Sequence, residues 1–277
     1  MGRAAAAAAR PGVARSSFSC DMRLHARQAG SSAAKPRRAE RSGRTPFRRL
    51  AMAKALACPL PRDAPALRLV CLPHAGGAAA AYRAWAAALP DTVELHIYQP
   101  PGRGARASEP AHATPSALIA EVVDALGPLL GAPYALFGHS FGSVVALEVA
   151  ELLRTKKLPP PLCLFVSAHG APDEPVPPSQ RGMAALPDAE LLEALHIWDV
   201  DAAGLGLTGD ADDAETTAAL LRPLRADLAL REALLPLAPA AAGPLPLAVH
   251  AFGGAADRSV DGASLARWAE RGAEAAP

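Results

Sequence analysis

The sequence predicts an α/β fold, a mostly parallel β-sheet with flanking helices. From about residue 66 onward, short apolar runs alternate with longer helical patterns, which is typical of strands joined by crossover helices. The first run, LRLVCLP (67–73), is apolar on both faces, as a buried parallel strand is. With 277 residues, one large core is favoured over two small domains.

The other elements continue this alternation. Further strands are predicted in VELHIYQPPGRG (93–104), which ends in a Pro/Gly turn, and at YALFGHS (134–140), PLCLFVSAH (161–169) and LPLAVHAFGG (245–254). Helices are predicted at AAAAYRAWAAALP (78–90), PSALIAEVVDALGPLL (115–130) and FGSVVALEVAELLR (141–154). Pro115 suits the first turn of its helix.

The alternation stops between residues 171 and 244, where no strand pattern occurs. This segment holds Pro-rich loop and Leu/Ala-rich helical stretches such as DAELLEAL. A helical insertion inside a sheet domain is most simply a lid over the functional edge of the sheet. The alternative is a set of extra helices packed on the side of the sheet.

The first 60 residues differ in composition from the rest. Residues 1–50 contain twelve Lys or Arg against two acidic residues. A segment rich in Ala, Arg and Ser without an apolar block is typical of an organelle transit peptide, and a disordered basic tail is the alternative. The folded domain is therefore expected at 61–277. The transit-peptide interpretation predicts a plastid protein, with mitochondrion or cytoplasm as alternatives.

The composition also argues against several partners and sites. The formal net charge is only +1 and 51% of the residues are hydrophobic, so neither nucleic acid nor a membrane surface is expected as a partner. No run of about 18 apolar residues predicts a transmembrane helix. The four cysteines form no CxxC or other paired spacing, so neither a disulfide framework nor a metal site is expected, and Cys71 and Cys163 are predicted to be buried.

The stretch GHSFG (138–142) is the first candidate for chemistry. It follows a predicted strand and opens a predicted helix, which is the context of a nucleophile elbow, with Ser140 exposed at the turn. Gly138 and Gly142 would remove side chains that otherwise collide in so sharp a bend. The backbone N–H of Phe141 is one expected oxyanion donor, and the loop PHAGG (73–77) supplies the second, from Ala75 or its neighbour.

An activated serine also needs a base and an acid. In this strand–turn–helix arrangement the acid is expected just past a late strand, where Asp257 follows the turn at Gly253 and Gly254. His74 lies in the predicted oxyanion loop and is interpreted as structural. His139 lies inside the elbow and is expected to point away from Ser140 by strand alternation.

Together, these residues and the segments around them resemble a known family, the type II thioesterases of the α/β-hydrolase fold. These enzymes cleave acyl groups from carrier proteins of polyketide, non-ribosomal peptide and fatty-acid synthesis. The resemblance implies Ser140 as the nucleophile, Asp257 as the acid and 171–244 as a mobile lid that admits an acyl-phosphopantetheine arm. It rests on the blocks LVCLPHAGGAAAAYRAWAAALP, QPPGRGAR, YALFGHSFGSVVALEVA, SAHGAPDEP, LPDAELLEAL, LLRPLRADLALREA and FGGAADRSV.

The sequence departs from this family at one point. In the family the catalytic histidine follows the acid, in a Gly-His turn after one more strand, whereas here no histidine follows His250 and the sequence ends 20 residues after Asp257. A last strand and helix are therefore expected to be missing, leaving a sheet edge uncovered. Loss of the histidine costs about 10⁶-fold in turnover in one triad enzyme. Three explanations stay open: a truncated or mis-spliced form of an active enzyme, a catalytically inactive homologue, or replacement of the base by His74 or His169.

The function expected from these residues is hydrolysis of acyl thioesters held on acyl or peptidyl carrier proteins, through an acyl-enzyme on Ser140. The alternatives are an inactive protein that binds acylated carriers, and a general esterase or lipase. No cofactor is expected, because the substrate itself carries the phosphopantetheine. A monomer is expected, and the sequence gives neither the acyl chain length nor the identity of the carrier.

Overall fold

A computed structural model of the chain describes residues 54–172, 178–195, 214–234, 243–257 and 259–273. All of them belong to the unit that runs from Arg38 to Pro277. The basic segment 1–53, on which the transit-peptide prediction rests, lies outside the described residues.

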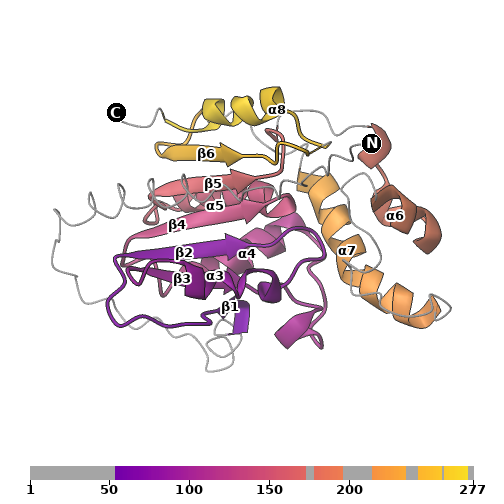
Figure 1. The fold of residues 1–277 in the computed structure, drawn as a ribbon, viewed down its shortest axis with the longest axis horizontal. Helices are drawn as coiled ribbons and strands as arrows, with labels where there is room; N and C mark the ends of the chain where they lie inside the picture. Colours follow the sequence, from indigo (N-terminus) through magenta and orange to yellow (C-terminus); the bar gives the residue numbers. More distant parts are fainter. Residues whose placement is uncertain (1–53, 173–177, 196–213, 235–242, 258, 274–277) are drawn as a thin grey trace, which may run out of the picture. The chain divides into compact units, whose positions relative to one another are not determined.

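The described residues form an α/β fold around one mixed, mostly parallel sheet (Figure 1). Within the described ranges the sheet has six strands in the order β1-β3-β2-β4-β5-β6. All neighbouring pairs are parallel except β1 with β3. The strands are β1 (Leu56–Ala57), β2 (Leu67–Leu72), β3 (Val93–Tyr98), β4 (Tyr134–His139), β5 (Cys163–Ser167) and β6 (Ala248–Phe252). The predicted fold class is thus confirmed.

Helices cover both faces of this sheet. The longer ones, α4 (Pro115–Leu126) and α5 (Phe141–Thr155), bury their apolar residues against Val70 and Leu72 of β2 and against alternate residues of β4 and β5. On the other face, Tyr82 and Trp85 contact the ring of Phe137, with ring centroids 6.0 and 5.0 Å apart. Alternation along each strand therefore fills two layers of core, as the apolar character of the strands predicts.

The segment 78–90, predicted to be helical, contains two short helical pieces and no continuous helix. It forms a 3₁₀ turn, η2 (Ala79–Tyr82), and a short helix, α3 (Trp85–Ala88). The backbone N–H of Ala79 donates to the side chain of Gln99, and the rings of Tyr82 and Trp85 pack against Phe137. These tertiary contacts override the helix propensity of the alanines.

The sheet begins earlier in the chain than the sequence indicated. β1 lies within the segment 1–60 that was assigned to the amino-terminal extension, and it pairs antiparallel with β3. Ala55 is buried at 1% exposure and accepts a hydrogen bond from the N–H of Gln99 at 2.8 Å. A strand of two residues has no periodicity to read, so sequence patterns could not reveal it.

The described parts of 171–244 are helical. They contain α6 (Asp188–Leu195) and α7 (Ala214–Leu234), together with the 3₁₀ turns η4 (Pro178–Gln180) and η5 (Met183–Ala185). Met183, Leu191, Leu221, Leu224 and Leu228 belong to a small core of their own. Figure 1 shows α7 beyond the carboxyl ends of the parallel strands. This is the edge at which ligands bind in open α/β sheets.

After the insertion, the chain returns to the sheet. β6 begins at Ala248, three residues later than predicted, and Leu245 forms an isolated parallel bridge with Gly272. The helix α8 (Gly262–Ala266) and the 3₁₀ turn η8 (Arg267–Arg271) follow, and Trp268 of η8 is fully buried.

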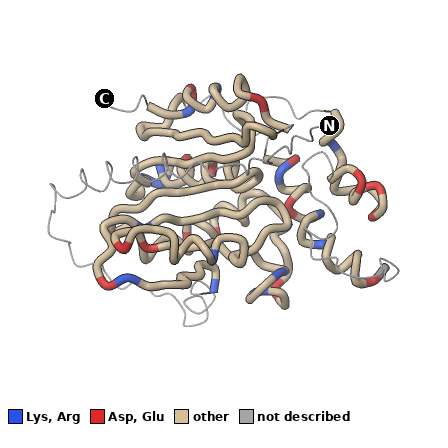
Figure 2. The backbone as a smooth tube through the Cα atoms, viewed as in Figure 1, with Lys and Arg blue, Asp and Glu red and all other residues tan. Residues whose placement is uncertain are grey.

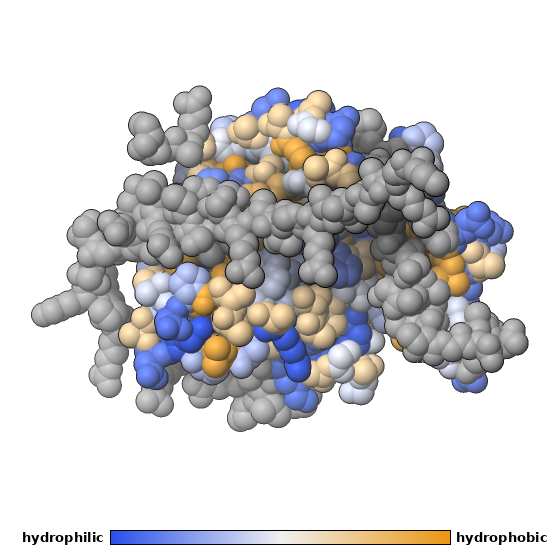
Figure 3. Space-filling model, in the orientation of Figure 1, coloured by the Kyte–Doolittle hydropathy of each residue, from blue (hydrophilic) through white to orange (hydrophobic). Residues whose placement is uncertain are grey.

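Charged residues of both signs are spread over the described part of the chain. In Figure 2, basic and acidic residues are interspersed along the tube, and β4, β5 and β6 carry neither kind. Figure 3 shows hydrophilic and hydrophobic residues side by side on the described surface that faces the viewer. Among the described helices, none combines the length and the hydropathy that a bilayer crossing requires.

Candidate functional site

Ser140 lies in a sharp turn between β4 and α5. Its backbone has φ 52° and ψ −121°, a conformation that is strained for a residue with a side chain. The N–H of Ser140 donates to the carbonyl of Ser167 at 2.7 Å, which ties the turn to the end of β5. Within the described residues, the hydroxyl of Ser140 has no hydrogen-bond partner, so it is available to a ligand at the sheet edge.

The two flanking glycines are required by the closeness of the backbone. A Cβ added at Gly138 would lie 2.2 Å from the carbonyl oxygen of Gly142, and one added at Gly142 would lie 2.1 Å from the carbonyl oxygen of Leu72. Both distances are far below van der Waals contact. Only glycine at both positions lets strand, turn and helix approach this closely.

The predicted oxyanion donors come from two segments, the start of α5 and the loop after β2. α5 begins at Phe141, so the N–H of Phe141 has no carbonyl partner inside the helix. In the loop after β2, the N–H of Gly77 donates to the carbonyl of His74 and the N–H of Gly76 donates to the Asp227 carboxylate. The N–H of Ala75 is left, like that of Phe141, without a partner among the described residues.

Two histidines share this end of the sheet. The rings of His74 and His139 meet edge to face with centroids 5.8 Å apart. Burial lowers the pKa of His74 to about 4, and the neighbouring His139 and Arg103 act in the same direction. Nδ1 of His139 is 3.2 Å from the hydroxyl oxygen of Ser167. Both imidazoles are therefore held in place and are neutral near pH 7.

Asp257 lies in the loop after β6, where the sequence predicted the acid. Its Oδ1 accepts from the N–H of Ser259 at 2.8 Å, from the hydroxyl of Ser259 at 2.7 Å and from the N–H of Val260 at 3.3 Å. Burial lowers the pKa of His139, and the Asp257 carboxylate opposes that shift. Asp257 and His139 are thus electrostatically coupled at the same sheet edge.

His169, the other residue considered as a replacement base, is enclosed in the core. It is 8% exposed, its Nδ1 is 2.7 Å from the carbonyl of Gly170, and its own carbonyl accepts from the indole N–H of Trp268. Burial lowers the pKa of His169 to about 4. Nε2 of this ring has no partner among the described residues.

A buried ion pair that sequence reasoning missed holds the loop that follows β2. The guanidinium of Arg103 donates to the Asp227 carboxylate at 2.5 Å and, through Nε, to the carbonyl of Gly77 at 2.6 Å. The same carboxylate accepts from the N–H of Gly76 at 2.8 Å. Asp227 belongs to α7, so a side chain from the 171–244 segment holds Gly76 directly, and it holds Gly77 only through Arg103.

Arg103 is itself positioned by Gln99. The carboxamide of Gln99 donates to the carbonyl of Arg103 at 2.8 Å and accepts from the N–H of Ala79 at 3.1 Å. A Cβ on Gly104 would lie 2.8 Å from the Gln99 oxygen, and Gly104 has φ 55°. The stretch QPPGRG thus forms a turn that places Arg103 against α7. In the sequence, the arginine between two glycines of this turn was the signal that could have indicated its role.

A small cavity opens beside the turn. It has a volume of about 20 Å³ and lies between the end of β2, helices α4 and α5, and α7. Its wall is mostly apolar, with the Arg103–Asp227 pair as its charged part. The lining includes Leu72, Pro73, Leu118, Phe141, Val145 and Leu230.

Comparison with known proteins gives consistent matches. A family model described as "Thioesterase domain" matches residues 67–272. The gramicidin S biosynthesis protein GrsT of Aneurinibacillus migulanus is 32% identical over 209 residues, which are 74% of this chain and 76% of that protein.

Two solved structures extend these matches to the fold. The RedJ thioesterase from the prodiginine biosynthetic pathway of Streptomyces coelicolor is 37% identical with a TM-score of 0.63, covering 76% of this chain and 75% of its own. YbtT, a type II thioesterase from the yersiniabactin pathway, is 25% identical with a TM-score of 0.65, covering 79% of this chain and 86% of its own.

Proposed function

This chain belongs to the thioesterase domain family and is a hydrolase of the class that acts on thioesters, and we propose that its substrates are acyl groups held on carrier proteins of non-ribosomal peptide, polyketide or fatty-acid synthesis. The proposal is supported by its relatives, which are named for gramicidin S, prodiginine and yersiniabactin biosynthesis. In such pathways the acyl group is bound through a phosphopantetheine thioester, so the partner is an acyl or peptidyl carrier protein.

The proposed reaction proceeds through an acyl-enzyme on Ser140. The Ser140 oxygen attacks the thioester carbonyl carbon, the carbon–sulfur bond breaks, and the carrier thiol leaves with a proton. Water then attacks the serine ester, releasing the free acid and restoring the hydroxyl. The observation that carries this proposal is the strained conformation of Ser140, together with the unpaired N–H groups of Phe141, the next residue, and of Ala75, in the loop after β2. Such donors stabilise the negative charge that develops on the carbonyl oxygen.

The proton of Ser140 requires an acceptor at the same edge. The histidines that meet there are His74 and His139, and the Asp257 carboxylate acts on His139. We assign the base to this pair, with Asp257 stabilising the imidazolium that forms. His74→Ala and His139→Ala should each be assayed for thioester hydrolysis. If both variants keep the activity of the unmodified chain, the assignment is refuted.

The test of hydrolysis uses the full chain and an acylated carrier protein. Release of free acid should be abolished by Ser140→Ala, while a circular dichroism spectrum checks that the variant is folded. Equal rates for both proteins would refute the role of Ser140. Faster hydrolysis of soluble p-nitrophenyl esters than of carrier thioesters would favour a general esterase or lipase.

A second function is favoured by one observation. No imidazole nitrogen of the described residues is hydrogen-bonded to the Ser140 hydroxyl, which fits a protein that binds acylated carriers without turning them over. A fluorophosphonate probe separates the two, because only an activated serine reacts with it. Absence of labelling together with retained carrier binding would support the binding protein.

We also propose that the basic segment 1–53 directs the protein to the plastid. The support is the excess of Arg and Ala and the scarcity of acidic residues in that segment. A fluorescent protein fused to residues 1–60 should accumulate in plastids. A mitochondrial or cytosolic signal would refute this targeting.

A further inference from the structure

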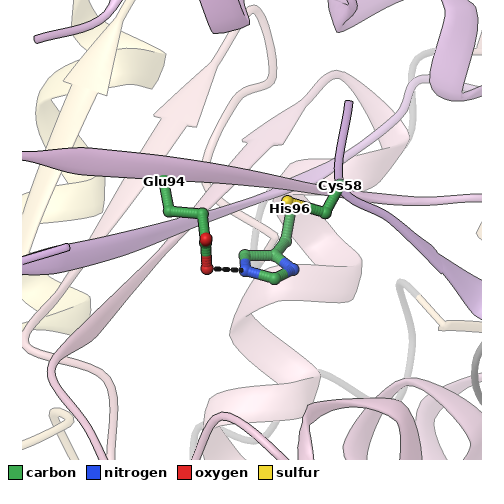
Figure 4. A group of neighbouring side chains, drawn as sticks. All are labelled: Cys58, Glu94 and His96. Atoms are coloured by element: carbon green, nitrogen blue, oxygen red, sulfur yellow. Dashed lines mark hydrogen bonds and ion pairs between the residues drawn. The ribbon is translucent and has the colours of Figure 1, made fainter. Parts of the chain in front are cut away.

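Three side chains with different donor atoms meet at the β1 edge of the sheet (Figure 4). β1 pairs antiparallel with β3 through Leu56 with Tyr98 and Ala57 with Ile97. Continuing this register by one residue places Cys58 opposite His96. Glu94 is two residues from His96 on the same strand, so both side chains project from the same face.

The donor atoms of this group are close enough to share one ion. The Cys58 sulfur, a Glu94 oxygen and a His96 nitrogen all lie within 4.8 Å of one another. The shortest of these separations is between Oε1 of Glu94 and Nε2 of His96, at 2.8 Å. In a tetrahedral zinc site, bonds of about 2.0–2.3 Å place the ligand atoms roughly 3.3–3.7 Å apart. Side-chain shifts of about 1 Å or less would therefore create a site.

The surrounding backbone already orients two of the three ligands. The N–H of Arg62 donates to Oε2 of Glu94 at 2.8 Å, which leaves Oε1 facing His96. The N–H of Leu60 hydrogen-bonds with the Cys58 sulfur. Contacts of this kind hold metal ligands in place and tune them.

The electrostatics of the group favour an added cation. Glu94 is 8% exposed and next to a partly buried thiol. The guanidinium of Arg68 lies 3.6 Å from Oε1 of Glu94 and compensates only one of the two potential anions. A divalent cation would compensate both.

We propose that Cys58, Glu94 and His96 bind a zinc ion, with water as the fourth ligand. Mixed sulfur, nitrogen and oxygen donors suit zinc, whereas magnesium and calcium prefer oxygen alone. On binding, the Cys58 thiol loses its proton, and His96 coordinates through one ring nitrogen while the other carries the proton. The site lies two strands away from β4 and its serine, so the ion would fasten β1 to β3 and take no part in hydrolysis.

The experiment measures zinc uptake by the full chain after removal of metal with a chelator. Equilibrium dialysis should give one zinc ion per chain, and Co²⁺ in place of zinc should give a thiolate-to-metal charge-transfer band. Cys58→Ser should abolish that band and weaken zinc binding at least tenfold. Cys163→Ala is the matched control, because Cys163 is buried in β5 away from this group, and it should bind zinc as the unmodified chain does.

A second variant and a second readout guard against misfolding. His96→Gln should weaken zinc binding to a similar degree, with circular dichroism confirming that each variant is folded. Zinc should raise the Tm of the unmodified chain and of Cys163→Ala but not that of Cys58→Ser, because a ligand stabilises only the state that binds it. Failure to take up zinc, or uptake that is unchanged in Cys58→Ser and His96→Gln, would overturn the proposal. Neither result depends on whether the chain hydrolyses thioesters.

Discussion

Replacing Asp227 by Asn removes the charge that faces Arg103 without removing side-chain volume. The amide oxygen can still accept from the N–H of Gly76, so the variant isolates the ion pair from the loop contact. The Arg103 and Asp227 side chains are only 10% and 8% exposed. The guanidinium in the variant is therefore left buried without its counter-charge.

The expected cost follows from that burial. Breaking a buried ion pair by removing one partner costs about 3–5 kcal/mol. Since the Gly76 hydrogen bond is retained, we expect the lower end, about 3 kcal/mol. At about 2–4 °C per kcal/mol for a domain of this size, the Tm should fall by roughly 6–12 °C.

A loss of activity should accompany the loss of stability. Arg103 and Asp227 hold Gly76 and Gly77, which follow the proposed oxyanion donor Ala75. Removing one such donor costs about 10²–10³-fold in kcat, so a displaced donor should cost about 10-fold or more. KM should change less than kcat, because the contact is proposed to act in the transition state.

The same helix region supplies a matched control. Asp188 of α6 pairs with Arg225 of α7 at 2.5 Å, but these side chains are 39% and 24% exposed. Asp188→Asn should cost about 1 kcal/mol or less, since solvent screens such a pair. Thermal unfolding by circular dichroism and steady-state thioester hydrolysis measure both effects. If Asp227→Asn matches Asp188→Asn in Tm and in kcat, the Arg103–Asp227 pair does not hold the loop.

Three further predictions concern α5. Gly142→Ala should prevent folding, because its Cβ would lie 2.1 Å from a carbonyl oxygen; soluble protein with a native circular dichroism spectrum would contradict this. Ser143→Ala should cost about 1–3 kcal/mol in urea unfolding, since the fully buried Ser143 hydroxyl donates to the Gly138 carbonyl at 2.9 Å and accepts from the Ser167 N–H at 3.1 Å; an unchanged midpoint would contradict it. Burial raises the pKa of Glu148 from 4.5 to about 7, so its ionisation disfavours the folded state progressively as the pH rises between those values. Glu148→Gln should therefore raise the Tm more at pH 8 than at pH 5, and an equal shift at both would show that the raised pKa is not the cause.

The fold and the position of the serine could be predicted because both depend on local patterns. Apolar runs of strand length revealed five of the strands that the structure describes, and strand, glycine and helix fall in the order that a sharp turn at Ser140 requires. The two-residue β1 and the broken segment 78–90 could not be predicted in this way. Their conformations depend on pairing with β3 and on contacts with Gln99 and Phe137.

The contacts around the serine were harder to predict because they join distant parts of the chain. Arg103 and Asp227 are 124 residues apart and meet only because α7 crosses the carboxyl ends of the strands. Cys58 and His96 similarly meet through the antiparallel pairing of β1 with β3, which the spacing of the cysteines does not predict. Sequence patterns identify elements, whereas the partners of single polar side chains emerge only when the elements are assembled.

The early start of the sheet limits how far the chain can be shortened from its amino terminus. A cut after residue 60 would remove Ala55 from the core, together with the carbonyl that receives the N–H of Gln99. Because Gln99 also supports the turn that carries Arg103, such a cut would loosen the loop beside Ser140 from a distance. Any shortened version of the chain that is to keep this loop in place should therefore begin before Ala55.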